Sequence, residues 1–182
     1  MMQLTKLFRL ALTAALLLAG AAQQARADIQ TVTGDTTFAP TFLRPGYRGG
    51  EPPSYAPDVA YQAYNISVTV DDWQYSLVTA CDFNCTAFFY KDSFDPKNPQ
   101  KNIMDGAADD GFNLTGLEES MSPGHKYVLV IAGYYDYDWG AYSTTVGGPG
   151  EIHISPVPEP SAYLTLLAGL AGLGLLARRR RA

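Results

Sequence analysis

Three aspartates that lie close together in the sequence have the chemistry of a calcium site. Asp105, Asp109 and Asp110 belong to one glycine-flanked segment, DGAADDG. Calcium takes six to eight oxygen ligands, which carboxylates on flexible loops commonly supply. The spacing is not that of an EF-hand loop, because the alternating aspartates and the closing glutamate are missing. The segment therefore indicates either a calcium site or the solvated carboxylates of a turn, and no other cofactor is expected.

A second stretch combines aromatic rings with carboxylates. Residues 134–139 read YYDYDW and follow a strongly apolar run. Aromatic faces stack on sugar rings, and neighbouring carboxylates accept hydrogen bonds from sugar hydroxyls. Tyr135, Tyr137 and Trp139 are therefore candidate carbohydrate contacts. The alternative is that alternate rings of this run fill the end of the folded domain, and the sequence leaves both interpretations open.

The sequence contains no recognisable catalytic motif. A nucleophilic triad needs a histidine that a carboxylate positions beside a nucleophile. The chain has two histidines, His125 after a Pro-Gly turn and His153 in an alternating segment, where structural roles are expected. G-x-S-x-G, H-E-x-x-H and glycine-rich phosphate loops are missing. The domain is therefore predicted to be non-catalytic, although a glycosidase using two carboxylates carries no motif and stays the alternative.

Two cysteines stand four residues apart, Cys81 and Cys85. On a straight strand they would lie roughly 13 Å from each other, too far to be bridged. Asp82 and Asn84 between them favour a tight turn, which would bring the two sulfur atoms together. A disulfide is therefore predicted. A zinc site is not expected, because the chain has too few cysteine and histidine ligands.

Alternation of apolar and polar residues predicts β-strands along the middle of the chain. Residues 36–44 contain a proline and are expected to form at most an edge piece. The turn Asp71-Asp72 predicts a hairpin between the strands on either side of it. Residues 125–133 form the most continuous apolar run and are apolar on both faces, so this strand should be central and buried. Strands are predicted at 28–34, 64–70, 73–78, 86–90, 112–117, 125–133, 141–146 and 151–154.

Helical periodicity is missing from the whole middle segment. Many short strands with frequent turn signals are typical of an antiparallel β-sandwich. The predicted fold class is therefore all-β, a jelly-roll-like antiparallel β-sandwich spanning residues 28–155. It is flanked by an N-terminal signal helix and a C-terminal transmembrane helix, for which the evidence follows.

The N-terminus has the pattern of a secretory signal peptide. Lys6 and Arg9 precede an apolar run, and the small-residue site Ala25-Arg26-Ala27 follows it. This pattern predicts export through the Sec pathway with cleavage after Ala27, so residues 1–27 form the signal peptide. Between Asp28 and Val157 there are 17 acidic and 6 basic residues, a net charge of −11. Such an acidic segment should repel nucleic acid and anionic lipid as a whole, and nucleic acid is excluded as a partner.

The C-terminus combines three elements in a fixed order. A proline-rich break is followed by an uncharged apolar run at 162–177 and by a cluster of arginines. The run would extend roughly 24 Å as a helix, and flanking residues can complete a membrane crossing. The arginines should stay on the cytoplasmic side. The elements are Val157, Pro158, Glu159 and Pro160, the apolar run, and Arg178, Arg179, Arg180 and Arg181.

This tail, residues 156–182, resembles the PEP-CTERM sorting signal of Gram-negative bacteria. The resemblance implies an exosortase as partner and cleavage near the Pro-Glu-Pro motif. The exported segment also resembles the sandwich domains of such proteins, which are similar to pre-peptidase C-terminal (PPC-like) jelly rolls. The matching features are the aromatic strand Phe88-Phe89-Tyr90 and a series of turns. The cysteine pair stands where that family usually has an aspartate, so this turn is expected to differ.

These features together predict an exported, exosortase-processed protein. It would be anchored in the inner membrane on the periplasmic side, then reach the cell surface or extracellular matrix. Its sandwich would have a structural or binding role, with exopolysaccharide as a candidate partner. The alternatives are an exported polysaccharide-active enzyme, and a calcium- or carbohydrate-binding module that keeps its membrane anchor.

Overall fold

The computed structural model describes residues 27–47, 50, 52, 58–109, 111 and 113–158, and ten β-strands make up this part of the chain. The signal peptide and the C-terminal apolar run lie outside it, so both remain predictions. Within the described residues no helix has the length and apolarity needed to cross a membrane. The strands are β1 Ala27–Asp35, β2 Thr41–Leu43, β3 Asp58–Val68, β4 Asp72–Cys81, β5 Cys85–Lys91, β6 Ile103–Ala108, β7 Leu114–Met121, β8 Tyr127–Gly133, β9 Ala141–Pro149 and β10 Ile152–Pro156.

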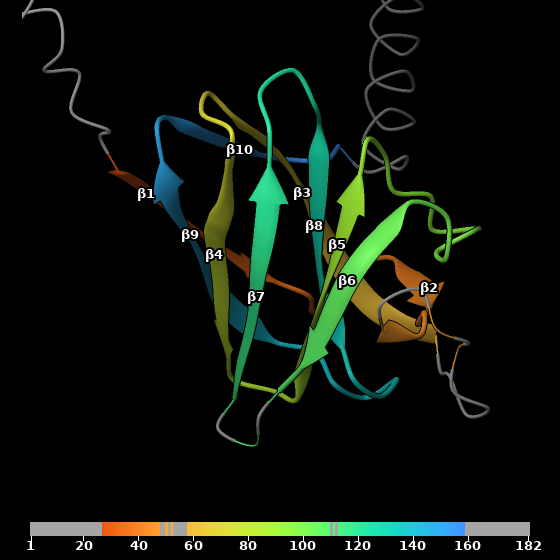
Figure 1. Ribbon diagram of the computed structural model, residues 1–182. Coiled ribbons are helices and arrows are strands. Elements are labelled where there is room, and N and C mark those ends of the chain that lie inside the picture. Colours follow the sequence, from red (N-terminus) through yellow and green to blue (C-terminus); the bar gives the residue numbers. More distant parts are fainter. Residues whose placement is uncertain are drawn as a thin grey trace, which may run out of the picture.

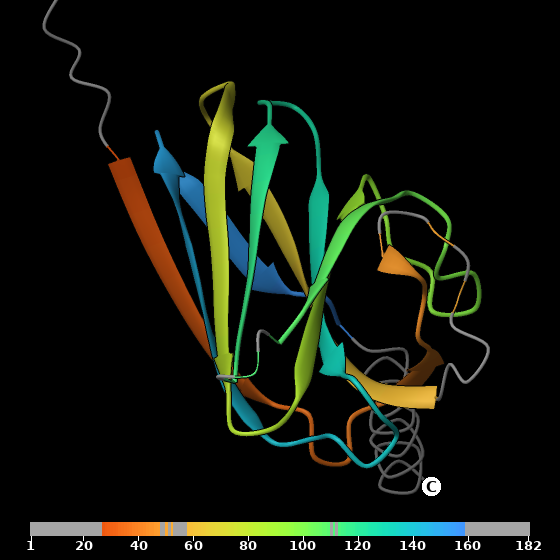
Figure 2. The same ribbon diagram turned by 60° about the horizontal axis from the view of Figure 1, so that its bottom comes forward.

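The strands form two antiparallel sheets that face each other as layers (Figures 1 and 2). One sheet has the order β1-β9-β4-β7, and the other has the order β10-β3-β8-β5-β6 with β2 added to β3. Apart from the short β2 and the β5–β6 hairpin, successive strands alternate between the two sheets. The predicted all-β sandwich is confirmed.

The main core lies between the two sheets and follows from the alternation of each strand. Tyr75 and Leu77 of β4 point inward toward Phe89 and Leu129 of the other sheet, and all four side chains are buried. β8 lies between β3 and β5, as predicted for the most apolar strand.

A second apolar cluster covers the outer face of the larger sheet. Phe88 and Tyr90 point to this face, where Phe42 of β2 and Phe94 of the β5–β6 connection cover them. This cover explains why β5 and β8 are buried on both faces. The irregular segments around β2 and after β5 therefore act as part of the core.

The structure corrects three details of the expected strand pattern. β3 and β4 do not form a hairpin across Asp71-Asp72, because they belong to different sheets. Residues 105–108 belong to β6, and residues 147–149 extend β9 where a loop was expected. Alternation shows which face of a strand is buried, but both sheets bury a face in the same core, so it does not select the partner strand.

The predicted disulfide is confirmed. Cys81 ends β4 and Cys85 begins β5, and the two are bonded with their Cα atoms 6.3 Å apart. The turn between them carries the chain from one sheet to the other, so the disulfide closes the sandwich at this end.

Candidate functional site

Several loops meet at the end of the sandwich that is lowest in Figure 2. They are the β4–β5 turn, the β6–β7 loop, the β8–β9 loop of residues 134–140 and the β1–β2 loop of residues 36–40. Backbone hydrogen bonds connect them: the amide of Asp82 donates to Ala141, and the amide of Tyr134 donates to Asn84. We refer to this region, with Phe38, Tyr135, Tyr137 and Trp139, as the aromatic end.

Hydrogen bonds and ring contacts hold the β8–β9 loop in place, and its first aromatic side chain, Tyr134, packs inward. Tyr134 lies against the buried side chain of Arg44, whose guanidinium carbon is 4.3 Å from the ring centroid. The carboxylate of Asp138 accepts a hydrogen bond from the amide of Tyr135 at 2.9 Å. Tyr135 in turn stacks on Tyr137, with the ring centroids 5.3 Å apart. The loop therefore has a defined shape without a ligand.

The later rings of the same loop face solvent. Tyr137 is 69% exposed and Trp139 is 51% exposed, whereas Tyr135 is only half-buried beneath Tyr137. Each of the two interpretations of the sequence, ring packing at the end of the domain and contact with carbohydrate, therefore fits a different part of residues 134–139. Tyr134 fills the end of the domain, and Tyr137 and Trp139 present aromatic faces outward with Tyr135 as support.

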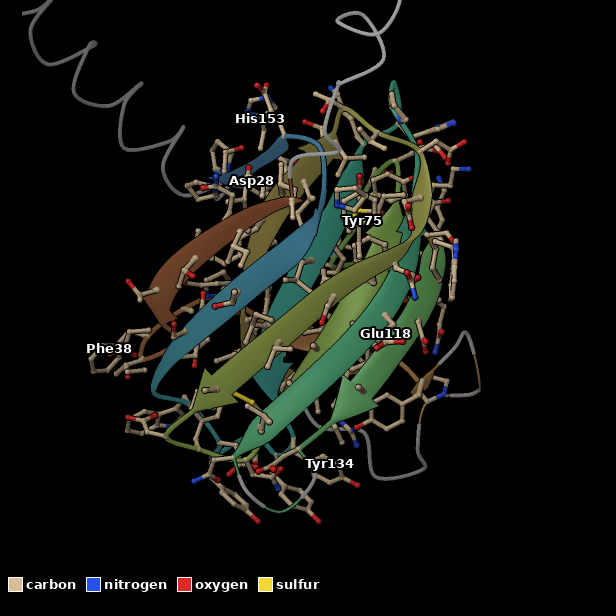
Figure 3. All side chains as sticks on the ribbon, turned by 60° about the vertical axis from the view of Figure 1, so that its left-hand side comes forward. Asp28, Phe38, Tyr75, Glu118, Tyr134 and His153 are labelled. Carbon is tan, nitrogen blue, oxygen red and sulfur yellow. A yellow bond between two sulfur atoms is a disulfide. The ribbon has the colours of Figure 1, made fainter. Side chains whose placement is uncertain are left out.

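Phe38 is a further exposed ring at this end, and sequence reasoning missed it. Its side chain is 102% exposed, and its backbone has the left-handed φ of 63°. A bulky residue in this conformation is uncommon and costs free energy. Figure 3 shows Phe38 projecting away from the ribbon at the end of the sandwich that also carries Tyr134. The residues around it, TTFAP, indicate only an edge strand before Pro40.

The electrostatic environment of the aromatic end is negative. Asp82, Asp109, Asp136 and Asp138 lie on its loops, and Asp35 is the last residue of β1 beside them. Burial raises the pKa of Asp138, and the neighbouring charge of Asp136 acts in the same direction, while the Tyr135 amide lowers it. Hydrogen bonds from Thr37 lower the pKa of Asp35. Anionic ligands are therefore disfavoured here.

The calcium candidates lie in different surroundings. Asp105 is on β6 opposite Phe89, and Asp109 follows the strand, so their Cα atoms are roughly 13 Å apart. Asp109 accepts hydrogen bonds from the amides of Gly111 and Leu114, which shapes the β6–β7 loop. Asp110 lies outside the described residues. In the part of the chain that the structure describes, no three His, Cys, Asp or Glu side chains are grouped for a metal. Calcium binding stays a prediction, and a lower melting temperature in EGTA would support it.

The two histidines occupy exposed positions away from the aromatic end. The Nδ1 atom of His125 is 3.9 Å from a carboxylate oxygen of Asp92, and both side chains are largely solvent-accessible. His153 is exposed on β10, opposite Ser67 of β3. The structural roles expected for them and the non-catalytic nature of the domain stay predictions.

The first residues of the predicted sorting signal belong to the fold. Pro156 is the last residue of β10, and the amide of Val157 donates to the carbonyl of Ala63 at 2.8 Å. A pocket of about 240 Å³ lies beside them, lined by Tyr61, Gln62, Ala63, Tyr64, Phe94, Pro96, Pro156, Val157 and Pro158. Glu159, Pro160 and Arg178–Arg181 lie outside the described residues. The last strand thus extends to Pro156, one residue beyond residue 155, where the sandwich was predicted to end.

A family model described as the PEP-CTERM protein-sorting motif matches residues 156–181. The chain therefore carries this motif, as its sequence indicated, and the motif implies export and sorting by an exosortase. No curated protein matches the chain. The match concerns the sorting of the protein and leaves the role of the sandwich open.

Two solved structures are distantly similar to the chain. A family 35 carbohydrate binding module from an environmental isolate has 11% identity and a TM-score of 0.38, covering 74% of this chain and 99% of that chain. Turnip yellow mosaic virus has 11% identity and a TM-score of 0.24, covering 77% and 87%. Neither similarity is close enough to support a statement about ligands.

Proposed function

We propose that the protein is an exported, non-catalytic binding module of the cell surface or extracellular matrix. The predicted helix at 162–177 anchors it in the inner membrane with the sandwich on the periplasmic side. An exosortase then processes it near Pro158-Glu159-Pro160. The sorting motif at 156–181 supports this route, and the signal-peptide pattern agrees with it.

We further propose that the aromatic end binds exopolysaccharide. The observation that carries this proposal is the exposure of Tyr137 and Trp139 on a loop whose backbone is fixed by internal hydrogen bonds. Exposed rings cost solvation free energy, and a preformed loop pays little entropy when a ligand binds. Sugar rings offer apolar faces for stacking, and their hydroxyls can donate hydrogen bonds to the neighbouring carboxylates. The negative surroundings favour polymers without acidic groups.

The chain offers a matched control for this proposal. Trp139 and Trp73 are both exposed, at 51% and 70%. Trp73 lies at the start of β4, whereas the end of β4 joins the aromatic end through Cys81. A loss of binding in Trp139→Ala but not in Trp73→Ala would therefore show that the ligand binds at the aromatic end, and not at any exposed tryptophan.

The test measures retention of the protein on immobilised exopolysaccharide extracted from the producing cells. We expect Trp139→Ala to weaken binding about tenfold, as for loss of a well-packed aromatic contact. Trp73→Ala should bind like the unchanged protein. Equal retention of all three proteins would contradict the proposal. Release of reducing sugars by the unchanged protein would instead favour the enzyme alternative.

A further inference from the structure

The charge of the domain is distributed unevenly. Four lysines, Lys91, Lys97, Lys101 and Lys126, occur between residues 28 and 158, and all four are exposed. Three of them lie on the last residue of β5 and the connection to β6. Lys126 precedes β8, and its carbonyl accepts the amide of Asp92 from that connection at 2.7 Å. The lysines of a domain with 17 acidic residues thus gather in one region, which we call the lysine face.

The lysine face adjoins the point where the chain leaves the sandwich for the sorting motif. Phe94 and Pro96 of the β5–β6 connection line the same pocket as Pro156, Val157 and Pro158. The connection is firmly held, because Phe94 packs on Tyr61 and Tyr90 with ring centroids 5.2 and 4.9 Å away. The surface from which the tail leaves the domain is therefore held in place by side-chain packing.

The tail leaves little distance between this surface and the membrane. Val157 is fixed to β3 by its hydrogen bond to Ala63, and the predicted transmembrane run begins at Ala162. Five Cα–Cα steps separate Val157 from Ala162, so the chain reaches at most about 18 Å when fully extended. The headgroup region occupies part of this length. The tail therefore keeps the domain within reach of the headgroups, and its attachment beside Ala63, which pairs with Val130 in the middle of β8, leaves the orientation to be set by charge.

Carboxylates in the same region do not cancel the lysine face. The β5–β6 connection also carries Asp92 and Asp95. Asp95 accepts the amide of Lys97 at 3.0 Å, and Asp92 lies 3.9 Å from His125. Asp71 accepts the hydroxyl of Ser122 at 2.8 Å in the turn that leads to Lys126. The four lysines outnumber these three carboxylates, whereas the described loops of the aromatic end carry aspartates.

We propose that the lysine face docks on anionic lipid headgroups while the chain is anchored, and that this contact turns the aromatic end away from the bilayer. The proposal rests on the anchoring proposed above. β8 runs from beside Lys126 to the aromatic loop, a length of about 20 Å. That separation exceeds the screening length of about 8 Å at physiological salt, so the acidic end is not repelled by the lipid surface. Polysaccharide binding and membrane attachment then use opposite ends of one domain.

The test uses the full chain reconstituted into vesicles of phosphatidylcholine alone or of an equal mixture with phosphatidylglycerol. A fluorophore is placed at Asn98→Cys on the lysine face or at Asp136→Cys on the aromatic end, and both positions are exposed. A headgroup-attached quencher reports proximity to the lipid. We expect strong quenching at position 98 and little at position 136 in the mixed vesicles. Replacing the four lysines by glutamine, or omitting phosphatidylglycerol, should abolish the difference.

Equal quenching at the two positions would overturn the proposal, and so would a difference that persists after the lysines are replaced. Failure of the chain to float with vesicles would overturn both the anchoring and the docking. Retention on exopolysaccharide is measured separately and should be unchanged in the lysine variant. It therefore reports whether the variant is folded and whether the binding proposal holds independently.

Discussion

Thr36 and Gly140 join two loops that are far apart in the sequence. The amide of Thr36 donates to the carbonyl of Gly140 at 2.9 Å, and the amide of Gly140 donates to Oγ1 of Thr36 at 3.1 Å. Thr36 is fully buried. Phe38 follows one partner and Trp139 precedes the other, so this link brings exposed rings from two chain segments to the same end of the sandwich.

Thr36→Val should destabilise the protein because it removes the acceptor of the Gly140 amide without changing side-chain volume much. Because this amide is partly buried, leaving it without a partner should cost about 1 kcal/mol in the free energy of unfolding, the lower end of the range for buried donors. Urea denaturation measures this loss. Thr33→Val is the control, because Thr33 is exposed on β1 and should change stability by less than about 0.5 kcal/mol. Equal effects of both substitutions would refute a special role for the link.

Phe38→Gly should have opposite effects on stability and on binding. Glycine adopts the left-handed conformation of this position without strain, and the ring of Phe38 makes little contact to lose. We expect the free energy of unfolding to rise by up to about 1 kcal/mol. Retention on exopolysaccharide should fall if the ring contributes a stacking face. A more stable variant with full retention would mean that Phe38 is not part of the binding surface.

Gly133→Ala should displace the aromatic loop. A Cβ atom at this position would overlap the carbonyl oxygen of Asp138 and lie 2.9 Å from that of Tyr135. Because backbone atoms cannot move aside cheaply, we expect a loss of about 2–3 kcal/mol and weaker polysaccharide binding. Gly116→Ala is the matched control, since its Cβ would meet only the carbonyl of Leu77 at an ordinary 3.8 Å. Thermal unfolding of the two variants should differ clearly, and similar melting temperatures would disprove the argument.

The two titrating aspartates of the aromatic end should respond to pH in opposite directions. The raised pKa of Asp138 means that the folded protein holds this proton more tightly than the unfolded chain does. Its contribution to stability is therefore present below the unfolded value of 3.8 and is lost as the pH rises through the folded value. The lowered pKa of Asp35 gives a contribution that is present above its unfolded value and is lost as the pH falls.

Asp138→Asn should remove the first of these slopes, because asparagine keeps an acceptor for the Tyr135 amide but does not titrate. Asp35→Asn should remove the second. Melting temperatures of both variants between about pH 3 and about pH 6 provide the measurement. If neither substitution alters the pH profile of the unchanged protein, the electrostatic description of this end is wrong.

Local alternation predicted most of the long strands and the central place of β8, but it did not predict β6. Burial of one face imposes a period of two, and residues 127–133 break that period because both faces of β8 are covered. The partner of each strand was not predictable in this way. β3 pairs with β8, and β4 pairs with β7 and β9, through contacts between segments distant in the sequence. The packing of Phe42 and Phe94 over the outer face of the larger sheet was not predictable either, because the sequence around both residues indicates irregular structure.

The candidate site was predictable where its chemistry is concentrated in one run of sequence. Tyr137 and Trp139 stand out beside two aspartates, and the structure leaves both exposed. Phe38 carries no such signal. Its left-handed backbone conformation, usually taken by glycine, belongs to the turn that the amide of Ala39 closes on the carbonyl of Thr36. The lysine face was hidden as well, because Lys126 joins the other three lysines only through folding.

The intact mass of the protein recovered from its native cells tests the account most directly. Export and exosortase processing predict a polypeptide that begins at Asp28 and ends between Val157 and Ser161, with the Cys81–Cys85 disulfide intact. The mass of the full chain of 182 residues would contradict both predicted cleavages and with them the proposed route to the cell surface.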